Sequence, residues 1–390
     1  MTDTTTAPAT GASAKPAEKP ARPYFSSGPC AKPPGWDASK LATDSLGRSH
    51  RSKLGKERLK RAIDLTREVL KVPDTHRIGI VPASDTGAVE MAMWSMLGPK
   101  PVTCMAWESF GAGWVTDAVK QLRIDPEVIE ADYGDLPDLT RVSPDHDVIF
   151  TWNGTTSGVR VPNGDWIADD RTGLTFADAT SAVFAVDMPW DKLDVTTFSW
   201  QKVMGGEGGH GILILGPRAV ERLESYTPDR PLPKIFRMTK GGKLNEGIFE
   251  GSTINTPSML AVEDYIFALE WAQSIGGLDA LVARSEANAA ALGRIVADRD
   301  WLDHLAADPA VRSTTSVCLK LVTDADGDTQ GKLVKKMVSL LEAEDAAYDI
   351  ASYRDAPPGL RIWCGATVDT ADIEALGPWL DWAWAQAKSA

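Results

Sequence analysis

The sequence predicts an α/β protein whose larger part is built on a mainly parallel β-sheet. Short apolar runs rich in Val, Ile and Phe alternate with longer segments of helical character, which is typical of such sheets. The chain has 390 residues, which is long for one hydrophobic core and indicates two domains. The strands expected in the larger domain cover residues 77–81, 101–107, 147–152, 174–177, 194–199 and 211–215.

Helices are expected between and after these strands, because apolar residues recur there at helical spacing. In the larger domain the predicted helices cover residues 49–71, 88–97 and 115–122. The later elements are helices at 257–275 and 278–297, a strand at 316–322, a helix at 331–342, a strand at 360–364 and a terminal helix from 370.

Composition divides the chain into four parts. Residues 1–22, rich in Thr, Ala, Pro and Lys, cannot bury enough apolar surface to fold and are expected to form a disordered tail. Pro and Gly make residues 23–45 an extended arm, which we expect to pack on the smaller domain. The large domain is expected over 46–275, and a small C-terminal domain over 276–390.

Charge and cysteine content argue against several function classes. The net charge of −13 disfavours general binding to nucleic acid or to an anionic membrane. No apolar run approaches the ~18 residues of a membrane-spanning helix. The cysteines at positions 30, 104, 318 and 364 lack the spacing of a zinc site. We therefore expect a cytoplasmic protein that binds small molecules and neither nucleic acid nor membranes.

A lysine and an aspartate carry the strongest chemical signal. Lys202 stands before the glycine-rich run that ends at Gly211, and Asp178 ends the apolar strand that begins at Leu174. A lysine amine can form a Schiff base with a carbonyl cofactor, so the two together suggest a pyridoxal phosphate (PLP) site. Singly, each also fits an ordinary alternative: a surface lysine at a turn, or an aspartate that caps a helix.

The positions of several residues at the ends of predicted strands indicate that they belong to one binding site. Ligands of parallel α/β sheets bind beyond the carboxyl ends of the strands. Polar or aromatic residues occur at or just after the ends of several predicted strands, so we expect them to share one pocket. They are Ser84, Trp107, Asn153, Asp178 and Lys202.

Several short motifs occur in an order that resembles one enzyme family. They are Ser49-His-Arg-Ser-Lys53, Asn153-Gly-Thr-Thr-Ser-Gly158, Asp178, Gln201-Lys202, Asn255-Thr-Pro257 and Gly359-Leu-Arg361. The set is similar to that of phosphoserine aminotransferases, over residues 23–390. The resemblance implies a fold-type I PLP enzyme with a seven-stranded sheet, and the segments 84–90 and 108–114 look like a divergent bacterial or archaeal subgroup.

The resemblance also implies how the cofactor is held. Lys202 would bind PLP and move the substrate proton, and Asp178 would keep the ring nitrogen protonated. Trp114 would stack on the ring, with Trp107 as the competing candidate. The other implied contacts are Ser84, Asp85 and Gln201 at the phosphate, Thr155 at the phenolic oxygen, and Asn255 and Thr256 at the phosphate from the partner subunit of a homodimer. Because a carboxylate repels phosphate, we expect Asp85 to cap the helix or to face away.

Arginines define the substrates that the resemblance implies. Phosphoserine, 3-phosphohydroxypyruvate, glutamate and 2-oxoglutarate carry carboxylates and phosphates, which Arg binds bidentately. Arg361 matches the binder of the α-carboxylate. His50 and Arg51 of the other subunit, together with Arg354, match the binders of the distal phosphate, although Tyr353 stands where many relatives have His. The implied reaction transfers an amino group between glutamate and 3-phosphohydroxypyruvate in serine biosynthesis.

Other functions stay open on the sequence alone. An alanine- or serine-glyoxylate aminotransferase would share Lys202 and Asp178 but would act on substrates without a distal phosphate. A cysteine desulfurase needs a mobile nucleophilic cysteine, and neither Cys318 nor Cys364 has a reactive context. A PLP-binding regulator would usually carry a DNA-binding module, which neither the N-terminal tail nor the acidic charge provides. Action on the phosphorylated threonine of pyridoxine biosynthesis is also open.

Overall fold

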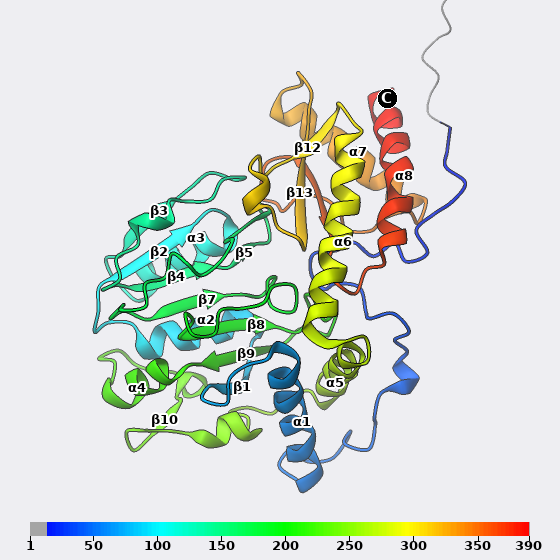
Figure 1. The fold of residues 1–390 in the computed structure, drawn as a ribbon. Coiled ribbons are helices and arrows are strands. Elements are labelled where there is room, and N and C mark those ends of the chain that lie inside the picture. Colours follow the sequence, from blue (N-terminus) through cyan, green and yellow to red (C-terminus); the bar gives the residue numbers. More distant parts are fainter. Residues whose placement is uncertain (1–13, 390) are drawn as a thin grey trace, which may run out of the picture.

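The computed structural model describes residues 14–389 as an α/β fold around a seven-stranded sheet (Figure 1). The strand order is β1-β9-β8-β7-β4-β2-β3. Neighbouring strands from β3 to β8 run parallel, whereas β9 is antiparallel to both β8 and β1. The predicted mainly parallel sheet is confirmed. Its strands are β1 (Arg77–Pro82), β2 (Val102–Ala106), β3 (Glu127–Glu130), β4 (Asp147–Thr151), β7 (Thr175–Asp178), β8 (Val195–Ser199) and β9 (His210–Leu215).

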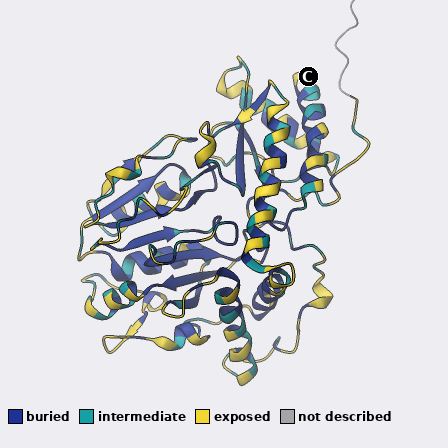
Figure 2. Ribbon diagram, viewed as in Figure 1, coloured by how far each residue is buried: buried dark blue, intermediate teal, exposed yellow. Residues whose placement is uncertain are grey.

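Helices cover the sheet, which explains why its strands are continuous apolar runs. Every residue of β2, β4, β8 and β9 is buried (Figure 2). Helix α2 is buried along most of its length because it packs against β1, β7, β8 and β9. The helices of this part are α1 (Lys53–Leu70), α2 (Ser84–Met96), α3 (Ser109–Thr116), α4 (Pro217–Ser225) and α5 (Met259–Ser274).

Several short elements were not predicted. Helix α3 begins earlier than expected and continues as a π-helical turn over Asp117–Gln121. Two small hairpins pair β5 (Asn153–Gly154) with β6 (Val159–Arg160), and β10 (Thr239–Lys240) with β11 (Lys243–Leu244). Short 3₁₀ helices cover Ala38–Lys40, Leu139–Arg141, Lys234–Phe236, Glu246–Glu250 and Pro309–Val311.

The turn from β1 into α2 is tight, and two glycines allow it. A Cβ at Gly87 would stand 2.2 Å from the carbonyl oxygen of Pro82, and one at Gly211 would stand 2.2 Å from that of Ser84. Ala83 and Ser84 both adopt positive φ, at 66° and 53°. The first turn of α2 therefore lies directly against β1 and β9.

The C-terminal part is a three-stranded antiparallel sheet covered by helices. Helix α6 leads into it from α5 at a bend of 88°. No single helix of the described chain is long and apolar enough to span a membrane, and α5 and α6 pass that test only as this bent pair. The elements are α6 (Gly277–Ala297), β12 (Leu302–His304), β13 (Ser316–Leu321), α7 (Gly327–Ala343), β14 (Gly359–Trp363) and α8 (Thr370–Lys388).

The N-terminal segment contacts both parts of the molecule. Residues 14–22 were predicted as part of a disordered tail, but the indole of Trp379 on α8 donates a hydrogen bond to the carbonyl oxygen of Glu18 (2.7 Å). The prediction is wrong for this stretch, because a segment that cannot fold alone can be held by polar groups of a neighbouring helix. Residues 1–13 of the predicted tail lie outside the described residues.

The following arm, residues 23–45, passes from the small sheet to the large domain. The Trp363 amide of β14 donates to the carbonyl oxygen of Phe25 (3.0 Å). Further along the arm, the Cys30 amide donates to the carbonyl oxygen of Gln201 (2.8 Å). The arm therefore runs over the glycine-rich loop that the sequence singled out.

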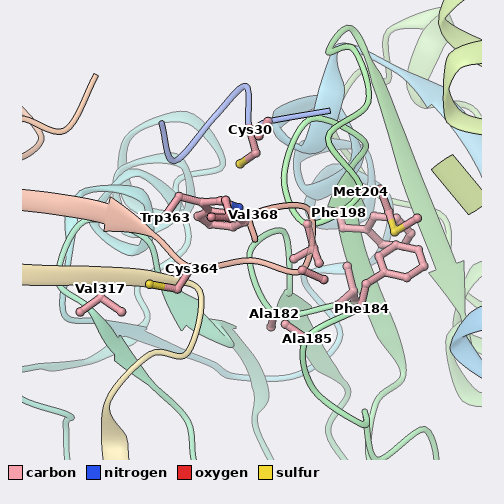
Figure 3. Packing of buried hydrophobic residues seen from close by; sticks show 14 of the residues in the cluster. Cys30, Ala182, Phe184, Ala185, Phe198, Met204, Val317, Trp363, Cys364 and Val368 are labelled. Atoms are coloured by element: carbon pink, nitrogen blue, oxygen red, sulfur yellow. The ribbon is translucent and has the colours of Figure 1, made fainter. Parts of the chain in front are cut away.

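One hydrophobic cluster joins the two parts and anchors that loop. Figure 3 shows Phe184, Phe198 and Met204 of the large domain on one side and Trp363 of β14 on the other. Phe184 and Phe198 meet edge to face, with ring centroids 5.6 Å apart. Because Met204 is buried in this cluster, the backbone just after Lys202 is fixed by packing.

Candidate active site

A cavity of about 260 Å³ lies at the carboxyl ends of the parallel strands. Its wall is formed by the ends of β4, β7 and β8, by the first turn of α2 and by the start of α3. Four of the five residues expected to share a pocket line it: Ser84, Asn153, Asp178 and Lys202. The fifth, Trp107, is not among the lining residues.

Lys202 is buried in the wall of this cavity, with 9% of its surface exposed. Its amine donates a hydrogen bond to the carbonyl oxygen of Ser27. Gly28 lies against this amine with a φ of 143°, a backbone conformation that favours glycine. Burial lowers the pKa of the amine and the charge of Arg361 lowers it further, against an opposing effect of Asp178. A neutral amine is the form that attacks a carbonyl group.

Asp178 ends β7, and two hydrogen bonds orient its carboxylate. Oδ1 accepts from the Thr180 amide (3.1 Å), and Oδ2 accepts from the indole of Trp114 (3.2 Å). Trp114 lines the cavity from α3. Trp107 instead donates its indole N–H to the carbonyl oxygen of Val159 (3.1 Å). Of the two candidate tryptophans, Trp114 lines the cavity and Trp107 does not.

Asp85 lies differently from expectation. It is in the first turn of α2 and lines the cavity with 7% of its surface exposed, so the expectation that it caps the helix or faces away is wrong. Because the turn is tight, Ala83 is the N-cap residue of α2 and Asp85 faces the cavity. Burial and then the neighbouring Asp178 raise the pKa of Asp85 well above its usual value, while the nearby hydroxyls of Thr197 and Thr180 oppose the rise.

Glu108 and Phe110 line the cavity as well, and the sequence analysis missed both. Glu108 caps α3: Oε1 accepts from the Gly111 amide and Oε2 from the Thr156 hydroxyl, both at 2.8 Å. Burial raises the pKa of Glu108 to about 7. Its place directly after β2, where site residues collect in parallel sheets, was the signal that could have found it.

Thr155 and Gln201 complete the predicted polar wall. The amide of Asn153 donates to the Ser181 hydroxyl (2.8 Å), which lies 2.8 Å from that of Thr155. Gln201 lines the cavity next to Lys202. Thr155 and Gln201 therefore both line the cavity, and their contacts with the cofactor stay a prediction.

Unpartnered polar atoms gather in this cavity. Buried polar atoms normally have hydrogen-bond partners, so such a cluster indicates a polar ligand. The cavity also offers an amine, a carboxylate, an indole ring and a helix N-terminus, which suit the aldehyde, ring nitrogen, flat ring and phosphate of PLP. Among the described residues, the lining side chains with a buried, unpartnered oxygen are Asp85, Thr151, Thr180, Ser199 and Gln201.

Arg361 and Arg354 lie near the cavity without lining it. Arg361 is half-buried on β14, and its Nε is buried with no partner in the described chain. Its guanidinium lies over the ring of Tyr353 at 5.7 Å, and that of the exposed Arg354 lies over the same ring at 5.5 Å. Tyr353 also contacts Phe110 (5.6 Å between ring centroids), which connects the two arginines to the cavity wall.

The other four predicted residues do not line the cavity of their own chain. His50 is half-buried and Arg51 is exposed, just before α1. Asn255 donates its side-chain amide to the carbonyl oxygen of Thr256 (3.2 Å), just before α5. The resemblance had assigned all four to the partner subunit, so their contacts stay a prediction.

The sheet, the buried lysine and the cavity define a PLP-dependent aminotransferase of fold type I. No family model matches the chain. A phosphoserine aminotransferase of Methanosarcina barkeri is 58% identical over 375 residues, which cover 96% of this chain and 100% of that relative. The chain belongs to the phosphoserine aminotransferase family.

Solved structures share the fold. The phosphoserine aminotransferase of Cytophaga hutchinsonii matches with a TM-score of 0.79 and 21% identity over 92% of this chain and 98% of that one. A PLP-bound phosphoserine aminotransferase of Trichomonas vaginalis matches with a TM-score of 0.73 and 18% identity, over 92% and 99% of the two chains. At such identities the similarity shows the fold, whereas the family follows from the archaeal relative.

Proposed function

We propose that this cavity transfers an amino group reversibly between glutamate and 3-phosphohydroxypyruvate, giving O-phosphoserine and 2-oxoglutarate. The observation that carries the proposal is the buried amine of Lys202, with its lowered pKa, in a cavity that Asp178 also lines. When bound, PLP supplies an aldehyde that links to amines and a ring that accepts electrons. The high identity to a phosphoserine aminotransferase favours these substrates over those of a glyoxylate aminotransferase.

The side chains of the cavity divide the work of binding and proton transfer. Lys202 Nζ, whose pKa is lowered by burial, moves the proton at the substrate Cα. Asp178 keeps a proton at the ring nitrogen, and the indole of Trp114 orients its carboxylate and stacks on the ring. Thr155 donates to the phenolic oxygen. The first turn of α2, with Ser84 and Asp85, and the side chain of Gln201 bind the phosphate.

Cations outside the cavity select the substrates. Arg361 binds the α-carboxylate, and its unpartnered Nε supports that role. Arg354 binds the distal phosphate together with His50 and Arg51 of a second copy of the chain. Asn255 and Thr256 of that copy reach the cofactor phosphate, so the active unit is a homodimer. We place the reaction in the cytoplasm, in serine biosynthesis and also in pyridoxine biosynthesis.

A half-reaction tests the function directly. The holoenzyme is mixed separately with phosphoserine, glutamate, serine and alanine, and the visible absorbance of the cofactor is followed. We expect phosphoserine and glutamate to convert the cofactor to its amine form, and serine and alanine to do so far more slowly. Conversion by alanine or serine but not by phosphoserine would overturn the proposal in favour of a glyoxylate aminotransferase.

Mixed dimers test the shared site. Chains with Lys202→Ala and chains with Arg51→Ala are each expected to be nearly inactive on phosphoserine. If Arg51 acts across the interface, random mixing yields one intact site in half of the dimers, or about a quarter of the wild-type activity. Activity no higher than the sum of the separate variants would contradict the shared site.

A further inference from the structure

Glu108 is an acidic group of the cavity that amino transfer does not use. Its side chain separates the active-site cavity from a second, more open pocket of about 650 Å³, and it lines both. Only 4% of its surface is exposed. The hydrogen bonds from Gly111 and Thr156 hold both carboxyl oxygens in place, so the group cannot turn away from the cavity.

The groups around Glu108 favour its neutral form. Burial is the main cause of its raised pKa, the carboxylate of Asp178 raises it further, and the hydrogen bonds from Gly111 and Thr156 oppose the rise. On the cavity side the titratable groups are Lys202, Asp178 and Asp85, and the Cys318 thiol also lies within electrostatic reach. On the side of the open pocket the titratable groups are Tyr133, Glu130, Asp132 and Asp355.

We propose that Glu108 controls the binding of anionic substrates: the neutral acid admits them, and the ionised carboxylate repels them. Each substrate brings at least two negative charges into a cavity that already holds the carboxylate of Asp178. A second carboxylate in the wall adds like-charge repulsion that solvent screens poorly at a buried site. The proposal rests on the assignment of this cavity as the active site.

The direction of the pH effect follows from the pKa. At a pKa of about 7, Glu108 is protonated in mildly acidic solution and ionised in alkaline solution. The folded value exceeds the 4.5 of an ordinary glutamate, so the stability linked to this proton is fully present below 4.5 and is lost as the pH rises to about 7. The affinity for dicarboxylates should fall as the pH rises through about 7, where the Glu108 carboxyl ionises.

Binding of glutarate, a dicarboxylate without an amine, provides the test. Its dissociation constant is measured calorimetrically with holoenzyme from about one pH unit below to about two units above the Glu108 pKa. We expect about tenfold weaker binding by wild type across this range. Glu108→Gln carries no charge and should bind equally across it, because its oxygen can still accept from the Gly111 amide and its nitrogen can donate to the Thr156 hydroxyl oxygen. Parallel profiles of the two proteins would overturn the proposal.

Two further variants make the outcome specific. Thr156→Val removes a hydrogen bond that lowers the Glu108 pKa, so the midpoint of the glutarate profile should move to higher pH; an unmoved midpoint counts against the proposal. Glu90→Gln is the matched control, since burial also raises the pKa of Glu90 but that residue does not line the cavity.

Thermal unfolding of the full chain gives a readout without substrate: the stability of Glu108→Gln relative to wild type should increase with pH up to about pH 7. Failure of phosphoserine to react would refute the proposed function and leave these profiles interpretable.

Discussion

The two ends of the large sheet differ in whether their buried polar groups have hydrogen-bond partners. At the amino end, Asp147 of β4 accepts hydrogen bonds from Arg222 (2.7 and 3.1 Å) and from the Leu174 amide (2.8 Å). Asp194, just before β8, accepts from Arg218 (2.9 Å) and from the Thr175 amide (2.9 Å). Each of these buried carboxylates is paired with a cation and a backbone amide.

At the carboxyl end, several buried polar groups have no hydrogen-bond partner in the described chain. Asp85, Thr151 and Ser199 each hold a buried oxygen without a partner in the described chain, and burial lowers the pKa of the Lys202 amine. Unsatisfied groups reduce stability, so they persist where function requires them. The amino end of the sheet therefore stabilises the fold, and the carboxyl end carries the chemistry. Substitutions at the two ends should separate these two properties.

The largest expected effect follows Lys202→Ala. Without the amine the protein loses both the attachment of the cofactor and the proton carrier, and turnover should fall about 10⁴-fold. The folded state should be no less stable, because a buried amine with a lowered pKa is removed. Steady-state rates and urea unfolding check the two halves of this prediction. Turnover within tenfold of wild type would remove Lys202 from the mechanism.

Asp178→Asn should lower turnover by about 100- to 1000-fold, since an amide cannot hold the proton of the ring nitrogen. The hydrogen bond from Trp114 can be kept by the amide oxygen, so the affinity for the cofactor should change much less. Comparing turnover with cofactor affinity measured by equilibrium dialysis checks this. A loss confined to cofactor affinity would make Asp178 a binding group alone.

Arg222→Met tests the opposite end of the sheet. It leaves the Asp147 carboxylate buried without its cation, and the free energy of unfolding should fall by roughly 3 kcal/mol. Turnover per folded molecule should stay at the wild-type level. The matched control is Arg294→Met, which breaks an exposed pair with Glu374 and should cost less than about 1 kcal/mol. Equal losses of unfolding free energy in the two variants would mean that the buried Arg222–Asp147 pair stabilises the fold no more than an exposed pair does.

The smallest expected effect is that of Asp85→Asn. Because the carboxyl of Asp85 is buried beside Asp178, its pKa is raised well above that of an ordinary aspartate, and an amide resembles the neutral acid. At neutral pH the free energy of unfolding should change by no more than about 1 kcal/mol. The advantage of the variant should grow with pH as the wild-type acid is forced to ionise. Urea unfolding at several pH values would reveal a flat difference if Asp85 were already ionised.

Local patterns predicted most of the fold. The strands of the sheet core were found because each is buried on both faces and therefore continuously apolar. Strand β3 was missed because it lies at the sheet edge, where only Ile129 is fully buried and the apolar signal is weak. Strand β12 has three residues, too few for a periodic pattern.

Site residues could be predicted where they lie at the end of a single strand. They could not be predicted where their position depends on contacts between distant segments. Lys202 and Asp178 were found because each follows its own strand. The burial of Asp85 depends on Gly87 and Gly211. Because neither has a side chain, the first turn of α2 can pack directly against β1 and β9. No local pattern contains that contact. The proposed role of His50 and Arg51 requires a second copy of the chain, which only the family resemblance implies.

Reductive trapping tests the central assignment most directly. The holoenzyme is treated with borohydride, digested, and searched by mass spectrometry for the peptide that carries the reduced cofactor. We expect the cofactor to be attached to Lys202 and Glu108→Gln to retain this attachment. Attachment to any other lysine in the wild-type protein would contradict the assignment.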